Sequence, residues 1–250
     1  MMFRVVREDV PFKINLNVND YVPTALVVGN ELFGGWCEDR KITGEDCDIS
    51  TLIRDLIGIS LYFLKSVHGN RQNDQDYLKN LYKIVNPEPI KSQLEFWYET
   101  LREFNVELSE DVLAYYVSSL GFYYAEAVFL LRKPESCDDY EVVMIFKSHD
   151  TGSCPEWIKK RKEGEIVRVT MTLKDFVTEV IKLAEEFLEI LEERKKYLSR
   201  RILINTQLSE ELSPEDESLR VRSVINVAQI KLAALKKFFW TVYQTKEYEV

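Results

Sequence analysis

Residues 125–147 read AEAVFLLRKPESCDDYEVVMIFK, and this stretch decides the class of fold. Two runs rich in Val, Phe, Ile and Leu, Ala125 to Leu131 and Tyr140 to Phe146, flank a polar connection that contains a proline. Such runs have the composition of strands, and a short turn-forming connection between them favours antiparallel pairing. We therefore predict a β-hairpin in the middle of the chain.

A second hairpin is predicted nearer the N-terminus. Thr24 to Val28 and Glu31 to Trp36 flank Gly29-Asn30, a pair that tolerates positive φ and suits a tight turn. Gly34-Gly35 is expected to end or bulge the second strand. Upstream, Phe12 to Val18 alternates apolar and polar residues with a period of two, which predicts a half-buried strand.

Helices are expected between the two hairpins. Asp48 is a candidate N-cap for a helix from Ile49 to Val67, whose apolar residues recur at helical spacing. Shorter helices are predicted from Asp74 to Val85, and again around Leu94 to Leu101. Another, capped by Ser109 and Asp111, is expected to run from Asp111 to Leu120.

The last third of the chain predicts one strand and two long helices. The strand spans Glu165 to Met171, and Thr172 with Asp175 has the spacing of a capping box at the start of the first helix. Ser213-Pro214 marks the start of the second. We predict an α+β fold, an antiparallel sheet from two hairpins packed against helices, with a C-terminal helical hairpin. The main domain would span residues 1–206, and residues 207–250 would form a helical extension packed on it or on a second copy.

Composition excludes several classes of protein. The chain has 46% hydrophobic and 30% charged residues, as globular proteins do, and its net charge of −9 makes duplex nucleic acid an unlikely partner. The first ten residues carry four charges, so they do not resemble a secretion signal, and the apolar stretch 115–131 is too short to cross a membrane. We expect a cytoplasmic protein without membrane contact.

The four cysteines, Cys37, Cys47, Cys137 and Cys154, stand far apart, so free buried thiols are expected. A zinc site with four cysteine ligands is the alternative, but such sites bring their ligands in close pairs. We predict no metal site and no cofactor.

An acidic segment suggests a binding surface. Trp36 precedes a polar stretch from Glu38 to Asp48, expected to be a loop, in which the acidic residues are Glu38, Asp39, Glu45, Asp46 and Asp48. Such a cluster is suited to a basic partner or to a divalent cation, although it lacks the ligand spacing of a calcium loop. An exposed loop without a specific role is the plainer interpretation.

Candidates for catalysis lie around Asp150. Asp150-Thr151-Gly152-Ser153 resembles the signature of the aspartic proteases, but those enzymes need two such carboxylates on an all-β scaffold, and this chain has one copy. The motif is therefore expected to be a turn. His149 beside Asp150 is a candidate general base in the alternative function, a hydrolase or nucleic-acid-processing enzyme with a site assembled from dispersed residues.

Residues 109–194 carry a resemblance to a known family. The order of features is a helix at Asp111 to Leu120, strands at 129–132 and 141–145, Pro155-Glu156-Trp157 in a loop, a strand ending at Met171 and a helix beginning at Leu173. This order resembles an uncharacterised bacterial domain family, some of whose members look like immunity proteins encoded near toxins. The resemblance implies partner binding and names no catalytic residues.

The preferred function is thus non-catalytic protein binding, as in an immunity or antitoxin protein that binds a basic partner through an acidic surface. We also expect a homodimer, because the C-terminal helix offers more apolar surface than an isolated helix can leave in water. Its apolar residues are Val224, Ala228, Leu235, Phe238, Phe239 and Val242.

Overall fold

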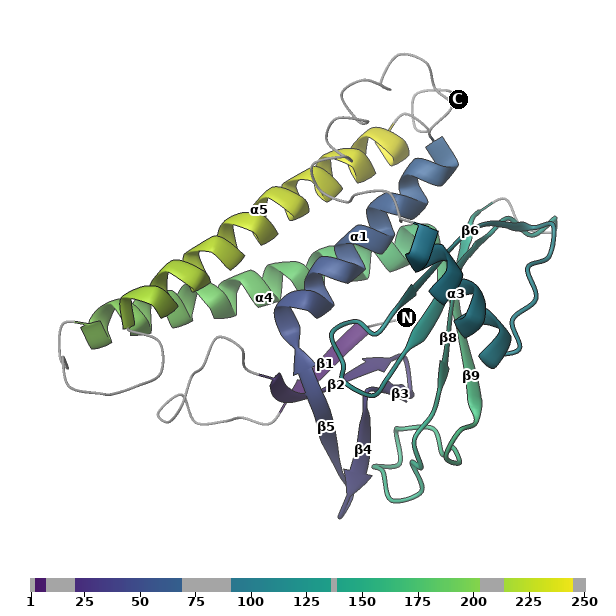
Figure 1. Ribbon diagram of the computed structural model, residues 1–250, viewed down its shortest axis with the longest axis horizontal. Coiled ribbons are helices and arrows are strands. Elements are labelled where there is room, and N and C mark those ends of the chain that lie inside the picture. The colour runs from purple at the N-terminus through teal and green to yellow at the C-terminus, as the bar shows by residue number, and fades with distance from the viewer. Residues whose placement is uncertain (1–2, 8–20, 69–90, 136–138, 203–213, 245–250) are drawn as a thin grey trace.

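The computed structural model describes residues 3–7, 21–68, 91–135, 139–202 and 214–244. These residues form two antiparallel sheets against a layer of three long helices (Figure 1). The predicted α+β class is confirmed.

The first sheet is built from the N-terminal strands. It contains β1 (Phe3–Arg7), β2 (Tyr21–Val28), β3 (Glu31–Phe33), β4 (Gly35–Glu38) and β5 (Lys41–Asp48), in the order β1-β2-β5-β4 with β3 paired to β2. The hairpin predicted at Gly29-Asn30 is confirmed, since Val28 pairs with Glu31 and Gly29 has a φ of 67°. Gly34 separates β3 from β4, as predicted. The strand expected at Phe12 to Val18 lies outside the described residues.

The acidic segment Glu38 to Asp48 is not the loop that we predicted. It forms the end of β4 and all of β5, joined by a turn in which Asp39 and Arg40 have φ values of 49° and 62°. The first half of β5 pairs with β4, and its second half pairs with β2. The segment forms a strand because it pairs with β2 and β4, and its polar composition does not indicate this long-range pairing.

The second sheet follows the chain order. It contains β6 (Val112–Ser118), β7 (Ala127–Arg132), β8 (Glu141–Lys147) and β9 (Ile166–Thr172). The hairpin predicted in the middle of the chain is confirmed as β7 and β8, with Leu130 opposite Val143. The strand expected from Glu165 to Met171 is β9, shifted by one residue.

The helix predicted from Asp111 to Leu120 is wrong, because this segment is β6. Asp111 does not cap a helix: its carboxylate pairs with Arg132 on β7, with Nη2 and Oδ2 2.6 Å apart. The segment is rich in β-branched and aromatic residues, and strand formation lets both of its faces meet other side chains. One of the features that carried the resemblance to the immunity-protein-like family is therefore absent.

The described helices are α1 (Ile49–His68), α3 (Lys91–Glu103), α4 (Leu173–Ile202) and α5 (Pro214–Gln244). The helices α1, α4 and α5 begin at the predicted start signals, and α3 covers the helix expected around Leu94 to Leu101. Asp48 Oδ1 accepts a hydrogen bond from the Thr51 amide at 3.2 Å, and Thr172 Oγ1 accepts one from the Asp175 amide at 3.0 Å. The helix expected from Asp74 to Val85 lies outside the described residues.

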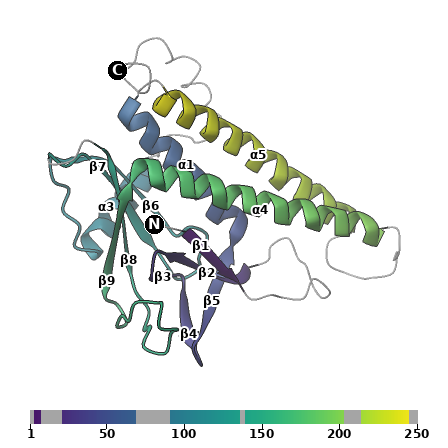
Figure 2. The ribbon, with the colours of Figure 1, turned by 180° about the vertical axis from the view of Figure 1, so that it is seen from behind.

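The predicted helical hairpin is confirmed as α4 and α5, which lie side by side in opposite directions (Figures 1 and 2). The α5 helix also packs on α1, and its Leu235 and Phe238 are buried together with Phe187 of α4. Much of the apolar face that led us to expect a homodimer is thus covered within the chain. Among the described residues, none of the helices combines the length and apolarity that a membrane crossing requires.

The cysteines differ from the prediction of free thiols. Cys37 of β4 and Cys154 form a disulfide across 117 residues of sequence. Sequence spacing did not indicate the pair, because only the fold brings the two residues together. Cys47 is free and buried, as predicted, and Cys137 lies outside the described residues.

Candidate functional site

The long connection between β8 and β9, residues 148–165, lies against the first sheet; we call it the β8–β9 loop. The Lys159 amide donates to the Asn30 carbonyl at 2.8 Å, and Ser153 Oγ donates to the Cys37 carbonyl at 2.6 Å. Cys154 and Ile158 are buried in a small apolar cluster with residues of β2, β3 and β4. The loop therefore has a fixed place on the sheet.

A buried ion pair anchors the same loop. Arg161 Nη2 and Nε donate to the two carboxylate oxygens of Glu31, at 2.7 and 3.0 Å, and Lys159 Nζ lies 3.4 Å from the same group. Glu31 is only 6% exposed. Its hydrogen bonds, together with those of Glu165, raise the pKa of Arg161. Bidentate geometry fixes both distance and orientation, so this pair positions the loop as well as holding it.

The Asp150-Thr151-Gly152-Ser153 motif is a turn within this loop, as predicted. Asp150 Oδ1 accepts from the Gly152 amide at 2.8 Å, the arrangement of an Asx turn. The buried Thr151 hydroxyl donates to the Lys159 carbonyl at 2.8 Å and accepts from the Arg161 amide at 2.6 Å. The turn places Asp150 at the surface.

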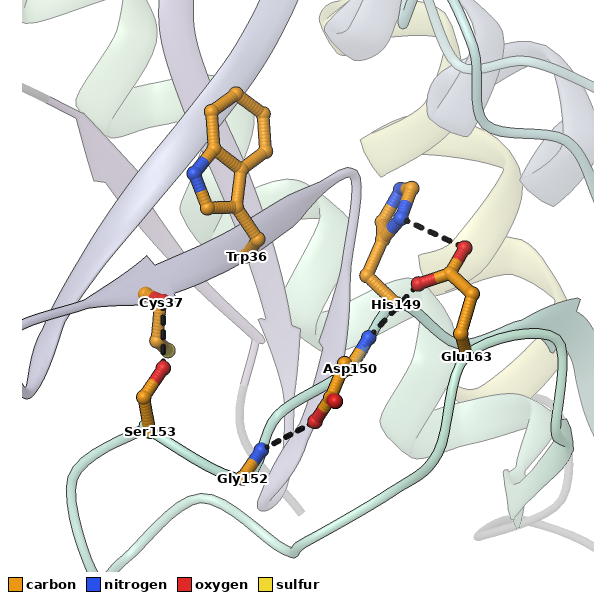
Figure 3. A pocket seen from close by; sticks show the side chains of 7 residues that line it. All are labelled: Trp36, Cys37, His149, Asp150, Gly152, Ser153 and Glu163. Atoms are coloured by element: carbon orange, nitrogen blue, oxygen red, sulfur yellow. Dashed lines mark hydrogen bonds and ion pairs between the residues drawn. The ribbon is translucent and has the colours of Figure 1, made fainter.

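An open pocket of about 660 Å³ lies between β4 and the β8–β9 loop (Figure 3). It is lined by Trp36, Cys37, His149, Asp150, Gly152, Ser153 and Glu163. The Cys37–Cys154 disulfide joins its two walls, and the Glu31–Arg161 pair ties the β8–β9 loop to the neighbouring strand β3. Trp36 is 43% exposed, which leaves part of its surface open to a partner.

His149 is held between two carboxylates. Its Nδ1 lies 3.4 Å from Glu163 Oε1, and its Nε2 lies 3.7 Å from Glu45 Oε2. Glu45, with Glu163 in support, raises the pKa of His149 against the opposing effect of partial burial. The imidazole therefore holds its proton to a higher pH than an exposed histidine does.

Glu45 is a buried carboxylate at the back of this arrangement, 3% exposed. Its Oε1 accepts hydrogen bonds from the Tyr124 and Ala125 amides, while Oε2 is buried without a hydrogen-bond partner. A buried carboxylate with one open oxygen is costly, and the proton on His149 is the nearest compensation.

The structure brings together some of the residues that the sequence singled out and separates others. Trp36 and Glu45, predicted for partner binding, meet His149 and Asp150, which were candidates for catalysis. Glu38 lies at the end of β4, beside the turn that contains Asp39. Asp48 is engaged as the cap of α1, and Asp46 stands between Glu45 and Cys47 on β5. The five acidic residues therefore do not form one loop.

The two serines near His149 and Asp150 in the described loop donate their hydroxyl protons to backbone carbonyls. Ser153 Oγ donates to the Cys37 carbonyl, and Ser148 Oγ donates to the His149 carbonyl at 2.7 Å. Neither hydroxyl is directed at the imidazole, as a serine nucleophile would be. Among the described residues, no group of three or more His, Cys, Asp or Glu side chains is placed to hold a metal ion.

Sequence reasoning missed two features of the site. Glu163 lies in a charged run that indicates a solvated surface, yet it contacts both His149 Nδ1 and the Asp150 amide. Tyr123 and Tyr124 are 67% and 78% exposed next to the amides that bind Glu45. The adjacent tyrosines that follow Gly121 and Phe122 were the sequence feature that could have indicated an exposed aromatic surface here.

Comparison of the chain with protein-family models, with curated proteins and with solved structures gives no match.

Proposed function

We propose that this protein is a non-catalytic binding protein that recognises a basic partner protein through the pocket between β4 and the β8–β9 loop. The observation that carries the proposal is that the exposed Trp36 and the carboxylate residues Asp150 and Glu163 line one open pocket.

This chemistry suits a guanidinium or ammonium group. A tryptophan face attracts a cation, and carboxylates beside it supply charge-assisted hydrogen bonds. Asp150 and Glu163 are both exposed, so a partner in solution can reach their side chains. An arginine side chain from a partner would contact the tryptophan ring and form hydrogen bonds with the carboxylates at the same time.

The surroundings support a protein partner. Tyr123 and Tyr124 are exposed near the buried Glu45, and exposed aromatic residues are typical centres of protein interfaces. The net charge of −9 favours rapid encounter with a basic surface. The resemblance to immunity-protein-like domains suggests a toxin as one class of partner.

His149 gives the proposed site a pH dependence. A protonated imidazole repels an incoming cation, so binding strengthens as pH rises through the raised pKa of His149. Binding would accordingly release a proton.

Peptide titration tests the proposal. Two blocked tripeptides, one with a central arginine and one with citrulline, are titrated while the indole NH signal of Trp36 is followed by NMR. The arginine peptide is expected to bind at least about fivefold more tightly, because only it makes charge-assisted contacts. Asp150→Asn, which preserves the turn, should remove this preference, and Glu38→Gln outside the pocket should leave it unchanged. Equal binding of the two peptides would refute the proposal.

Two further expectations belong to this proposal. A homodimer would use apolar residues of α5 that remain exposed, among them Ile230 and Trp240. The Cys37–Cys154 disulfide argues against the cytoplasmic location that the sequence led us to expect, since disulfides persist mainly in oxidising compartments.

The alternative, a hydrolase or nucleic-acid-processing enzyme, has one observation in its favour. His149 is held by Glu45 and Glu163 in the way that carboxylates orient a general base. Release of product that depends on His149 but not on Trp36 would favour this alternative over binding.

A further inference from the structure

A second cavity lies in the helical layer, built from elements that take no part in the pocket described above. It is a crevice of about 140 Å³ between α1, α4 and α5. Its apolar walls include Ile53 and Ile57 of α1, Phe187 of α4, and Val224 and Ala228 of α5. Ile53, Ile57 and Phe187 belong to the buried core, so these walls are held in place by packing on the far side.

The volume of the crevice sets the size of its occupant. An apolar protein cavity of about 150 Å³ accommodates benzene. A ring of six carbons, or a branched chain of similar volume, thus fits the space between the apolar walls of the crevice. A longer chain would have to extend into solvent.

The crevice also has a polar side, formed by Lys231 of α5 and Arg54 of α1. Arg54 is engaged by Asp55, with Nε and Oδ1 3.3 Å apart, and by the Thr51 hydroxyl. Asp55 in turn accepts a hydrogen bond from Ser118 Oγ at 2.7 Å. The Asp55 carboxylate is therefore already shared by two donors.

Lys231 has no such partner in the part of the chain that the structure describes. Neither an ion pair nor a side-chain hydrogen bond joins its ammonium group to another of the described residues, and the side chain is half-buried. Burial, and then the charge of Arg54, lower the pKa of Lys231, while Asp55 opposes them. An ammonium group in this setting is stabilised by an anion that brings its own apolar body into the crevice.

We propose that the crevice between α1, α4 and α5 binds a small monocarboxylate whose apolar body has about the volume of a benzene ring. The carboxylate pairs with Lys231, and the ring lies between Ile53, Ile57 and Phe187. This site is independent of the protein-binding pocket, and either can exist without the other.

Benzoate and benzamide form the matched pair of probes, since they share a ring and differ in charge. Each is titrated into the full chain labelled at its isoleucine and valine methyl groups, and NMR shifts of Ile53, Ile57 and Val224 report occupation. Benzoate is expected to bind at least about fivefold more tightly than benzamide, because only its carboxylate forms a charge-assisted contact with Lys231.

Three variants locate the effect. Lys231→Gln should reduce the preference for benzoate to less than about twofold, and Arg222→Gln, an exposed residue of the same helix outside the crevice, should leave the preference unchanged. Ala228→Leu fills the crevice and should abolish both titrations, with the melting temperature recorded to show that the chain is folded.

Several results would overturn the proposal. These are equal affinity for the two probes, an unaltered preference in Lys231→Gln, or methyl shifts centred away from the crevice. If Lys231 is a half-buried charge that binds no ligand, the Lys231→Gln variant should have a raised melting temperature and an unchanged response to benzoate.

Discussion

The Glu31–Arg161 pair should be a main support of the pocket wall, and Arg161→Met tests this. The change keeps most of the apolar stem but leaves Glu31, 6% exposed, with Lys159 as its remaining cationic partner. Removing one member of a fully buried pair costs about 3 to 5 kcal/mol, whereas an exposed pair is worth about 1 kcal/mol or less. Because the Arg161 side chain is 17% exposed, we expect a loss of about 2 to 3 kcal/mol in the free energy of unfolding.

The assay is urea and thermal unfolding followed by circular dichroism. For a chain of this size a loss of that magnitude lowers the melting temperature by about 4 to 12 °C. Lys236→Met is the matched control, because its pair with Glu185 is solvent-exposed and should contribute about 1 kcal/mol or less. A loss in Arg161→Met no larger than in this control would refute the role given to the pair. The double variant Glu31→Gln, Arg161→Met should lose less than the sum of the single changes.

Three more predictions concern the disulfide, the histidine and the oligomeric state. Cys154→Ser removes a disulfide whose cysteines are 117 residues apart and should lower the free energy of unfolding in urea by about 2 to 5 kcal/mol. A reductant should not destabilise this variant further, and an unchanged unfolding midpoint would contradict the disulfide. His149→Gln should cost more stability at about pH 6 than at about pH 9. The pKa of His149 is raised in the folded state, so the protonated imidazole stabilises the fold fully below the pKa of the unfolded state, and this stabilisation is lost as pH rises through the pKa of the folded state. Equal costs at the two pH values would show that the carboxylates do not hold the proton. Light scattering should give a dimer mass that Ile230→Asp reduces to that of a monomer, and a wild-type monomer at high concentration would remove the homodimer.

Local signals predicted much of the fold. The turn at Gly29-Asn30, the hairpin of residues 125–147 and the cap of α4 at Thr172 depend on a few neighbouring residues, and each is found in the structure. The errors fall where tertiary pairing decides. The polar β5 is ordered by β2 and β4, and β6 is tied to β7 by Asp111 and Arg132, which local helix signals do not register.

The candidate site was predicted in pieces but not as a whole. Trp36, Glu45, His149 and Asp150 stood out in the sequence for separate reasons, and the sequence carried no information on their distance from one another. The β8–β9 loop brings them together through long-range contacts, among them the disulfide and the pair between Glu31 and Arg161. A single sequence does not show such contacts.

The central claim is that the pocket between β4 and the β8–β9 loop holds a cationic side chain against Trp36. Intermolecular nuclear Overhauser effects between the bound arginine tripeptide and the protein test it most directly. We expect contacts from the arginine δ-methylene protons to the Trp36 ring, and we expect Glu163→Gln to remove them as the affinity falls. Contacts confined to the β4–β5 turn near Asp39, or the same contacts from the citrulline peptide at equal affinity, would contradict it.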